Sequence, residues 1–329
     1  MKVLFVGGTG IISSACARMA LDRGVDLTLL CRGKSGRHAA PHGAKVIHAD
    51  ARDAGSMRHA LGDARFDAVV QWVGFVPAHV ELDIQVFRAR TDQYIFISSA
   101  SVYQTPPSRL PITESTPAHN PYWQYSRDKI ACEDRLIHAY RGESFPVTIV
   151  RPSHTYDVGL LPIHGGWTVV DRMRRGLPVV VHGDGTSLWT LTHNDDFARG
   201  FVELLGMSAA IGDTFHITSD ETLTWNQIHE LIGHAAGVHP RLVHVPSDLI
   251  AAIDPDWGAS LLGDKAHSMV FDNTKIKRVV PGYLARTSYA SKAREQIAWY
   301  DENAARRVVN DATNVTIDRI IAQYDRVWP

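Results

Sequence analysis

A tyrosine and a lysine four residues apart carry the clearest chemistry in this sequence. Tyr125 and Lys129 belong to the run Tyr-Ser-Arg-Asp-Lys, and a spacing of four places two side chains on one face of a helix. A nearby ammonium group favours the phenolate and would lower the pKa of the tyrosine. We therefore predict that Tyr125 exchanges a proton with a substrate alcohol near neutral pH.

Ser99 supplies a third polar group, at the end of the predicted strand Tyr94–Ser98. In an open α/β sheet, ligands bind outside the carboxyl ends of the strands, so this hydroxyl is expected at the cleft. There it could hydrogen-bond the reacting oxygen. The alternative is that Ser99 caps a turn or a helix.

A glycine-rich turn follows the first predicted strand. Its sequence is Gly7-Gly8-Thr9-Gly10-Ile11-Ile12-Ser13, and such a turn lets backbone amides approach a pyrophosphate at a helix N-terminus. Ser13 stands where a third glycine is usual, and a small side chain there is compatible with close packing. A tight connection without a ligand is the alternative, but the position after a buried N-terminal strand favours a dinucleotide site.

The ends of the next two predicted strands bear on which dinucleotide would bind. The second ends in Arg32-Gly33-Lys34-Ser35, without the acidic residue that would contact the adenosine ribose of NAD. Arg32, with Lys34 and Ser35, could pair with the 2′-phosphate of NADP, or could form a solvated basic loop. Asp50 ends the third strand and could contact the adenine amino group or cap the following turn.

The elements that must position these residues alternate between strand and helix. Short continuous apolar runs predict buried parallel strands, and amphipathic stretches between them predict covering helices. The expected strands are Val3–Val6, Asp26–Cys31, Ala44–His48, Ala68–Val73, Tyr94–Ser98 and Val147–Val150, and the expected helices are Ile11–Arg23, Ala54–Leu61, His79–Arg88 and Tyr122–Tyr140. The fold class is therefore α/β, a Rossmann-type doubly wound parallel sheet.

The pattern loosens after Arg151, which predicts a smaller mixed C-terminal lobe. We expect residues 1–152 to form the NAD(P)-binding core and residues 153–329 mainly to bind substrate, with segments around 178–217 returning to the core. A helix at Trp167–Arg175, strands at Val179–Val181 and Thr214–Ile217, and helices from Trp225 and Ser288 are expected. The weakly patterned segment Asp254–Ser268 indicates a mobile flap over a cleft.

Taken together, these motifs resemble the extended short-chain dehydrogenase/reductases, the NAD-dependent epimerase/dehydratase family. The runs GGTGII, SSASVYQ, YSRDK, RPSHTY, HGDG, THNDDFA and DNTK fall in the family's order and span residue 3 to about 280. The resemblance implies that Ser99, Tyr125 and Lys129 are catalytic and that Lys129 also holds the nicotinamide ribose. It places Pro152 and His154 where cofactor and substrate meet.

The full set of expected ligand contacts follows from the motifs and the resemblance together. For the cofactor the residues are Gly7, Thr9, Gly10, Ile11, Ile12, Arg32, Asp50, Ala51, Lys129, Pro152 and His154. For the substrate they are Ser101, Trp123, His154 and Trp189. The cofactor is NAD(P), with NADP favoured, although an epimerase would hold NAD tightly.

Three departures from the family pattern narrow the reaction. Ala100 and Ser101 follow Ser99 where sugar 4,6-dehydratases carry an Asp-Glu pair, so elimination of water lacks its proton-transfer groups. Trp189 stands where an arginine often pairs with a nucleotide-sugar diphosphate. His154 replaces a common asparagine, and Asp157 a glycine.

Other residues of the second half could compensate for the altered diphosphate contacts. Arg172, Arg174 and Arg175 could supply cations to a nucleotide sugar, or could form a solvated helix face. Trp123, Trp167, Trp189 and Trp257 are expected in loops or at helix starts, where they could stack on a sugar or pack in the core.

Composition limits the partners. Lys and Arg number 34 against 35 Asp and Glu, giving a formal net charge of -1 that argues against nucleic acid and anionic membranes. The three cysteines show no metal-ligand spacing, and no metal site is expected. Scattered thiols and the absence of a signal or membrane segment favour the cytoplasm. By resemblance, a homodimer through helices His79–Arg88 and Tyr122–Tyr140 is possible.

The leading hypothesis is a redox enzyme acting on a sugar-like or nucleotide-sugar alcohol or ketone. Tyr125 would exchange the proton and the nicotinamide the hydride. Net reduction and redox-neutral epimerisation both fit. The alternative is a non-catalytic NAD(P)-binding regulatory or RNA-associated member of the same fold.

Overall fold

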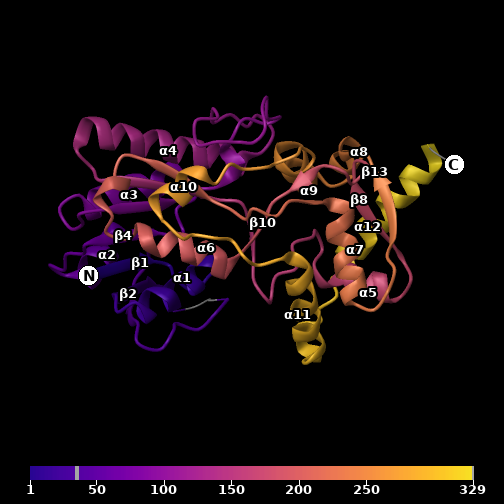
Figure 1. Ribbon diagram of the computed structural model, residues 1–329, viewed down its shortest axis with the longest axis horizontal. Helices are drawn as coiled ribbons and strands as arrows, with labels where there is room; N and C mark the ends of the chain where they lie inside the picture. Colours follow the sequence, from indigo (N-terminus) through magenta and orange to yellow (C-terminus); the bar gives the residue numbers. More distant parts are fainter. Residues whose placement is uncertain (34–36, 328–329) are drawn as a thin grey trace.

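A seven-stranded parallel sheet forms the larger part of the protein (Figure 1). The computed structural model describes residues 1–33 and 37–327. The strand order is β11 (Thr214–Ile217), β6 (Val147–Pro152), β5 (Tyr94–Ile97), β4 (Ala68–Gln71), β1 (Lys2–Val6), β2 (Asp26–Cys31) and β3 (Lys45–His48). The chain winds outward from β1 in both directions, so the predicted doubly wound α/β fold is confirmed. The six strands predicted in the first half are present, with bounds shifted by at most two residues.

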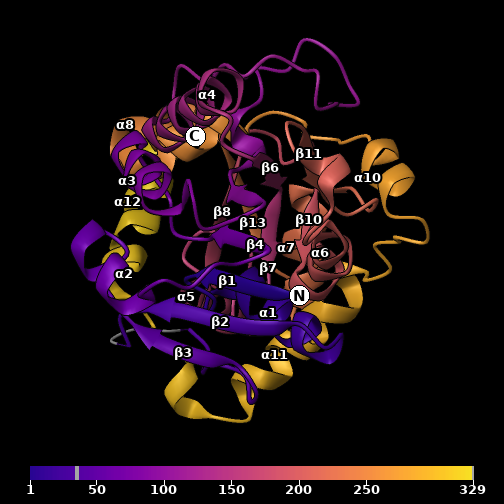
Figure 2. The ribbon, with the colours of Figure 1, turned by 90° about the vertical axis from the view of Figure 1, so that its left-hand side faces the viewer.

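Alternate residues of each strand bury opposite faces of this sheet. On β1, Val3 and Phe5 pack with α1 (Ile11–Asp22) and α6 (Asn194–Phe201). Leu4 and Val6 pack on the other face, in a core shared with three helices that Figure 2 shows beside the sheet: α2 (Ala54–Leu61), α3 (Pro77–Phe87) and α4 (Gln124–Glu143). Burial on both faces explains why these strands read as continuous apolar runs.

The second lobe has its own core, at the right of Figure 1. Its strands form three pairs: β7 (His154–Tyr156) with β10 (Leu191–His193), β8 (Pro178–His182) with β13 (Arg241–Val245), and β9 (Leu188–Trp189) with β12 (Leu223–Thr224). Its helices are α5 (Trp167–Arg174), α7 (Trp225–Ala235), α8 (Ser247–Ile253), α9 (Pro255–Ser260), α11 (Tyr289–Asp301) and α12 (Asp311–Val327), whereas α10 (Thr274–Val279) packs against β11 and the core of the large sheet. Of the segment 178–217, β11 lies in the seven-stranded sheet, whereas β8 pairs with β13 in the second lobe.

The segment 254–268, expected as a flap, is mostly helical. Asp254 caps α9, because its side chain accepts a hydrogen bond from the Trp257 amide, and a π-helical turn, Leu261–Lys265, follows directly. Trp257 and Leu261 are buried, which holds the segment against the second lobe. The helical apolar spacing is too short here to stand out in the sequence.

A buried ion pair joins α4 to the sheet. Arg151 of β6 donates to both carboxylate oxygens of Glu133 on α4, at 3.0 and 2.5 Å, and both residues are at most 6% exposed. The Arg151 guanidinium lies 4.7 Å from the ring centroid of Tyr103. Helix, strand and the loop after β5 therefore meet at one cation.

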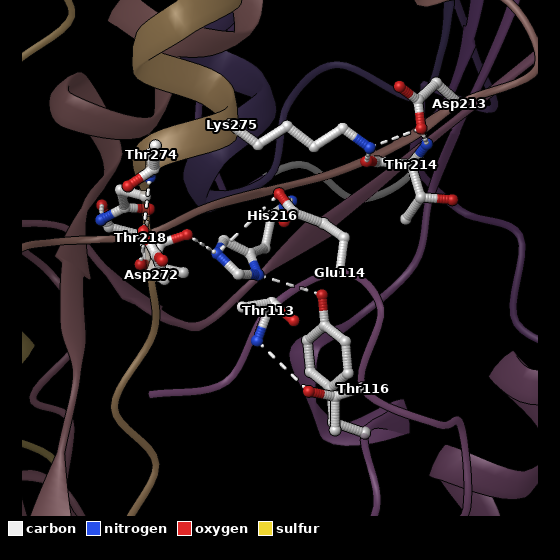
Figure 3. Close-up of polar contacts among 12 residues, drawn as sticks. Thr113, Glu114, Thr116, Asp213, Thr214, His216, Thr218, Asp272, Thr274 and Lys275 are labelled. Atoms are coloured by element: carbon white, nitrogen blue, oxygen red, sulfur yellow. Dashed lines mark hydrogen bonds and ion pairs between the residues drawn. The ribbon is translucent and has the colours of Figure 1, made fainter. Parts of the chain in front are cut away.

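The same chain of contacts reaches the edge strand β11 through His216 (Figure 3). The ring nitrogens of His216 hydrogen-bond the Tyr103 hydroxyl at 3.0 Å and the Asp272 carbonyl at 2.7 Å. Its backbone amide donates to Glu114, while Lys275 donates to Asp213 and to the Thr214 carbonyl. These bonds fix residues 271–275 against the end of the sheet.

We predict that Arg151→Met lowers the free energy of unfolding by about 3–5 kcal/mol, because Glu133 would remain buried without its partner. Urea denaturation measures the change. The double variant Glu133→Gln/Arg151→Met should recover part of the loss. The matched control Arg65→Met breaks an exposed pair with Asp92 and should cost at most about 1 kcal/mol. Equal losses in the two single variants would contradict the prediction.

Candidate active site

The three predicted catalytic residues converge at the carboxyl ends of β4 and β5. Tyr125 and Lys129 lie on the first turns of α4, and Ser99 follows β5. The Lys129 ammonium donates to the carbonyls of Gly74 and Ile97 at 2.6 and 2.7 Å and lies 5.9 Å from the centroid of the Tyr125 ring. The predicted helix spacing and strand end therefore bring the three residues to one place.

The predicted lowering of the Tyr125 pKa is wrong for this structure. Burial raises the pKa of Tyr125, and the Ser99 hydroxyl lowers it by less. The Lys129 ammonium donates its hydrogen bonds to two backbone carbonyls and not to the phenol oxygen. Burial also lowers the pKa of Lys129, to about 8. Desolvation therefore outweighs the charge of the neighbouring lysine at this tyrosine.

Ser99 both caps a short helix and lines a cavity, the two positions considered for it from the sequence. Its hydroxyl accepts from the Ser101 amide at 3.2 Å and so caps the 3-10 helix Ala100–Val102. It also lies 3.0 Å from the Ser101 hydroxyl, which in turn accepts from Ser126 of α4 at 2.8 Å. This polar chain fixes the position of Ser99 relative to the helix that carries Tyr125.

A cavity of about 300 Å³ opens onto Ser99 and Tyr125. Its lining comes from both lobes: Ser99, Ala100, Ser101, Trp123, Tyr125, Pro152, Ser153, His154, Thr155, Trp189, Thr190, Asp264, Lys265, Met269 and Phe271. All four predicted substrate contacts, Ser101, Trp123, His154 and Trp189, line it. The cavity therefore gathers side chains that are up to 172 positions apart in the sequence, from Ser99 to Phe271.

His154 and Trp189 form one wall of this cavity. The Trp189 indole donates to Nδ1 of His154 at 3.0 Å, which leaves Nε2 as the protonated nitrogen of the neutral ring. Burial and the nearby Lys265 lower the pKa of His154 to about 3. Trp189 lies in strand β9 and not, as predicted, in a loop or at a helix start, because it pairs there with β12.

The glycine-rich turn fits a pyrophosphate. Gly7 and Gly8 have φ angles of +98° and +122°, which side chains rarely adopt. A Cβ at Gly8 would also lie 2.8 Å from the Leu29 side chain. The Gly10 amide donates to Ser13 at 2.8 Å, so the serine in place of a third glycine is accommodated. The Gly7 amide is bonded to the Leu30 carbonyl, so the N-terminus of α1 is the part of this turn that could receive a phosphate group.

A second cavity, of about 230 Å³, continues from this turn. Its lining is Gly7, Thr9, Leu30, Cys31, Arg32, Ala49, Asp50, Ala51, Arg52, Val73 and Phe75. Five predicted cofactor contacts, Gly7, Thr9, Arg32, Asp50 and Ala51, are in it. Ile11 and Ile12 begin α1, and Pro152 and His154 line the first cavity instead. Lys34 and Ser35 lie outside the described residues.

Asp50 also serves as a turn cap, because its carboxylate accepts from the Arg52 amide at 2.9 Å. Arg52 itself was missed by the sequence reasoning. Its guanidinium donates to the Val73 carbonyl and lines the second cavity. A cation two residues after an acidic strand end was the available signal.

Arg172, Arg174 and Arg175 do not supply the cations considered for the diphosphate of a nucleotide sugar. Arg172 is buried and donates to Asp318 of α12, Arg174 pairs with Asp301 of α11, and Arg175 pairs with Asp171. None of the three appears among the described residues that line the first cavity. Arg172 and Arg174 instead join α5 to α12 and α11, and Arg175 pairs within α5.

Asp264 and Lys265 are the main functional candidates that the sequence reasoning missed. Both side chains line the first cavity from the π-helical turn. The run Gly-Asp-Lys at 263–265 was the only signal, in a segment without clear periodicity. Among residues 1–33 and 37–327 no group of His, Cys, Asp or Glu side chains is arranged to hold a metal ion. Nor does that part of the chain contain a helix long and apolar enough to span a membrane.

Comparisons with known proteins agree with this architecture. The NAD dependent epimerase/dehydratase family matches residues 3–217. The 2′-dehydrokanamycin reductase of Streptomyces kanamyceticus is 26% identical over 305 residues, which cover 91% of this chain and 84% of the reductase. Chloroplast stem-loop binding protein of 41 kDa b from Arabidopsis thaliana is 27% identical over 257 residues, 74% of this chain and 65% of that protein.

The structural match extends over both lobes. UDP-glucose 4-epimerase from Bifidobacterium longum, solved in complex with NAD+ and UDP, superposes with a TM-score of 0.74. The match covers 92% of this chain and 99% of the epimerase, at 20% identity. At this identity the likeness concerns the fold.

We predict that His154→Gln reduces the loss of stability on acidification. The folded pKa of His154, about 3, is below the ordinary value of 6.5, so the unfolded chain binds more protons between these two values. Stability therefore falls as the pH drops from about 6.5 towards 3. His182, His193 and His229, whose pKa values burial lowers to about 4, act in the same direction in both proteins.

The urea midpoints of both proteins at pH 4.5 and at pH 7 would measure this effect. The first pH lies between the folded and ordinary pKa values of His154, and the second lies above both. The difference between the two pH values should be smaller for His154→Gln than for the wild type. An equal or larger difference would show that His154 is protonated in the folded protein.

Proposed function

Because the chain belongs to the NAD-dependent epimerase/dehydratase family, we propose that it reduces a ketone of a sugar-like substrate to an alcohol with NAD(P)H. The observation that carries this proposal is that one cavity is lined by both Ser99 and Tyr125, with the Lys129 ammonium 5.9 Å from the centroid of the Tyr125 ring. The Gly7–Gly10 turn and the cavity around Arg32 and Asp50 would hold the cofactor. When bound, the nicotinamide supplies the hydride.

The side chains of the protein would handle the proton. Tyr125 donates its hydroxyl proton to the ketone oxygen as that oxygen gains charge, and Ser99 donates a hydrogen bond to the same oxygen. The Lys129 cation, 5.9 Å from the Tyr125 ring, stabilises the phenolate that results. A proton from solvent then restores Tyr125.

Net reduction is favoured over epimerisation by two observations. The similarity to 2′-dehydrokanamycin reductase extends over 91% of this chain. Arg32 lines the cavity proposed for the adenosine, where it suits the 2′-phosphate of NADP, the usual cofactor of reductases. Dehydration is disfavoured because Ala100 and Ser101 follow Ser99 without a carboxylate. An epimerase would instead retain tightly bound NAD.

A second candidate is a binding protein that has kept the fold. It is motivated by the similarity to a protein named for stem-loop binding over 257 residues. The formal net charge of -1 and the Ser99, Tyr125 and Lys129 group weigh against it. Failure to bind NADH and NADPH would exclude the reductase and favour this candidate.

Residues 1–152 would mainly hold the cofactor and residues 153–329 the substrate. The homodimer would form through α3 and α4, which already pack against each other in one chain. A cytoplasmic location is consistent with three free cysteines. Light scattering would test the homodimer.

We predict that Tyr125→Phe lowers kcat for ketone reduction by about 10²–10⁴-fold, because the proton donor is lost. NADPH oxidation with a panel of neutral and nucleotide-linked ketosugars measures the rate. NADPH affinity should be unchanged. The matched control Tyr122→Phe removes a hydroxyl from a residue that is 47% exposed and should leave kcat unchanged. Full activity of Tyr125→Phe would refute the proposed mechanism.

We predict that Arg32→Ala weakens NADPH binding by about 10- to 100-fold, since a charge-assisted contact to the 2′-phosphate is lost. NADH binding should change little. Calorimetric titration of both cofactors measures the two affinities, with exposed Arg58→Ala of α2 as control. Tightly bound NAD in the purified protein, or equal NADPH affinity of both proteins, would rule out the NADP assignment.

A further inference from the structure

The π-helical turn Leu261–Lys265 brings two opposite charges into the proposed substrate cavity. Asp264 and Lys265 lie side by side, with 3.7 Å between carboxylate and ammonium. Their side chains are only 13% and 20% exposed. Short π-helical segments are rare and frequently occur at functional sites.

The backbone of Lys265 is held unusually firmly. Its carbonyl oxygen accepts three side-chain hydrogen bonds, from His182 at 2.9 Å, Ser187 at 3.2 Å and Trp225 at 3.1 Å. These donors come from β8, the loop after it, and α7. A backbone fixed in this way presets where the Asp264 and Lys265 side chains enter the cavity.

The Lys265 ammonium also faces two aromatic rings. It lies 5.0 Å from the ring centroid of Trp123 and 5.7 Å from that of Trp189. Both tryptophans line the same cavity. Indole faces attract a cation and also stack on the C–H face of a sugar ring.

The cavity carries no net charge. Among the described lining residues, Asp264 and Lys265 are the charged side chains at neutral pH, and they offset each other. Burial raises the pKa of Asp264 to about 6 and lowers that of Lys265, while His154 is neutral. The remaining polar side-chain groups of the lining are the hydroxyls of serine, threonine and Tyr125 and the indole N–H groups of Trp123 and Trp189.

This composition of the cavity lining disfavours the binding of a diphosphate group. A group with two negative charges needs unpaired cations or several amide donors when it leaves water. Among the described lining residues, Lys265 is the lysine, and it is already paired with Asp264. The neighbouring Trp189 carries no charge. With a volume of about 300 Å³, the cavity is also at the small end of ligand sites.

Resting on the proposed reductase function, we propose that Asp264 and Lys265 bind neighbouring hydroxyl groups of an uncharged sugar or cyclitol ring. Lys265 donates to one hydroxyl oxygen, and Asp264 accepts from the next. Trp123 and Trp189 cover the C–H surface of the ring. The pairing of the two charges disfavours substrates that carry a nucleoside diphosphate.

Binding without turnover tests the proposal. Wild-type protein saturated with NADP+ is titrated with neutral methyl glycosides and inositols, and separately with UDP, by tryptophan fluorescence and calorimetry. At least one neutral probe should bind more tightly than UDP. Lys265→Met should weaken that probe by about 10- to 100-fold, the loss expected for a hydrogen bond to a charged group.

Asp264→Asn gives the discriminating result, because it leaves Lys265 without its counter-charge. The neutral probe should bind more weakly to this variant, whereas UDP should bind more tightly than to the wild type. The matched control Lys277→Met breaks the ion pair with Asp220, outside the cavity, and should change neither affinity.

The proposal would be overturned if no neutral probe binds, or if wild-type protein prefers UDP and Lys265→Met abolishes that binding. The second result would make Lys265 a phosphate ligand. Unchanged affinities in both variants would also overturn it. The Tyr125→Phe activity is independent of these titrations, so failure of the reductase mechanism and failure of this ligand assignment are distinguishable.

Discussion

The buried pair Glu133–Arg151 is the contact on which the geometry of the candidate site depends. Glu133 is one turn beyond Lys129 on α4, and Arg151 immediately precedes Pro152 at the end of β6. The pair therefore fixes the helix that carries Tyr125 to the strand that leads into the proposed substrate cavity. Two charges at this depth are costly to desolvate, and the double contact with Glu133 and the ring of Tyr103 offset that cost.

The second lobe is aligned through the same cluster. Tyr103 packs on Arg151 and bonds His216. His216 in turn bonds the carbonyl of Asp272 (Figure 3). The backbone of Ile112 also forms a parallel bridge with Phe271, and its carbonyl accepts a hydrogen bond from the Asp272 amide. Phe271, next to Asp272, lines the proposed substrate cavity. The position of the second-lobe wall of the cavity is thus set by contacts made at the edge of the sheet.

Much of the first lobe was predictable because its signals are local. Continuous apolar runs such as Val3–Val6 identify parallel strands. The end of β5 places Ser99 at the carboxyl edge of the sheet, and the spacing of four places Tyr125 and Lys129 on one face of α4. The lining of the second lobe was less predictable. Asp264 and Lys265 reach the cavity only through contacts with His182, Ser187 and Trp225, which no sequence period encodes. Arg172 likewise looked like a surface cation, yet it is buried against α12.

The prediction of a lowered pKa for Tyr125 was wrong for a related reason. Burial, and not the nearby lysine, dominates the pKa of this tyrosine. Sequence spacing reports that a cation is near, but not what else that cation binds or how far both groups are desolvated. In the structure, the Lys129 ammonium donates to two backbone carbonyls, and burial keeps His154 neutral. Lys265 forms an ion pair with Asp264. The last two of these features leave the cavity itself without an unpaired charge among its described lining residues. A reaction in which a hydride and a proton add to an uncharged ketone suits such a cavity, because neither reactant nor product then requires a compensating ion.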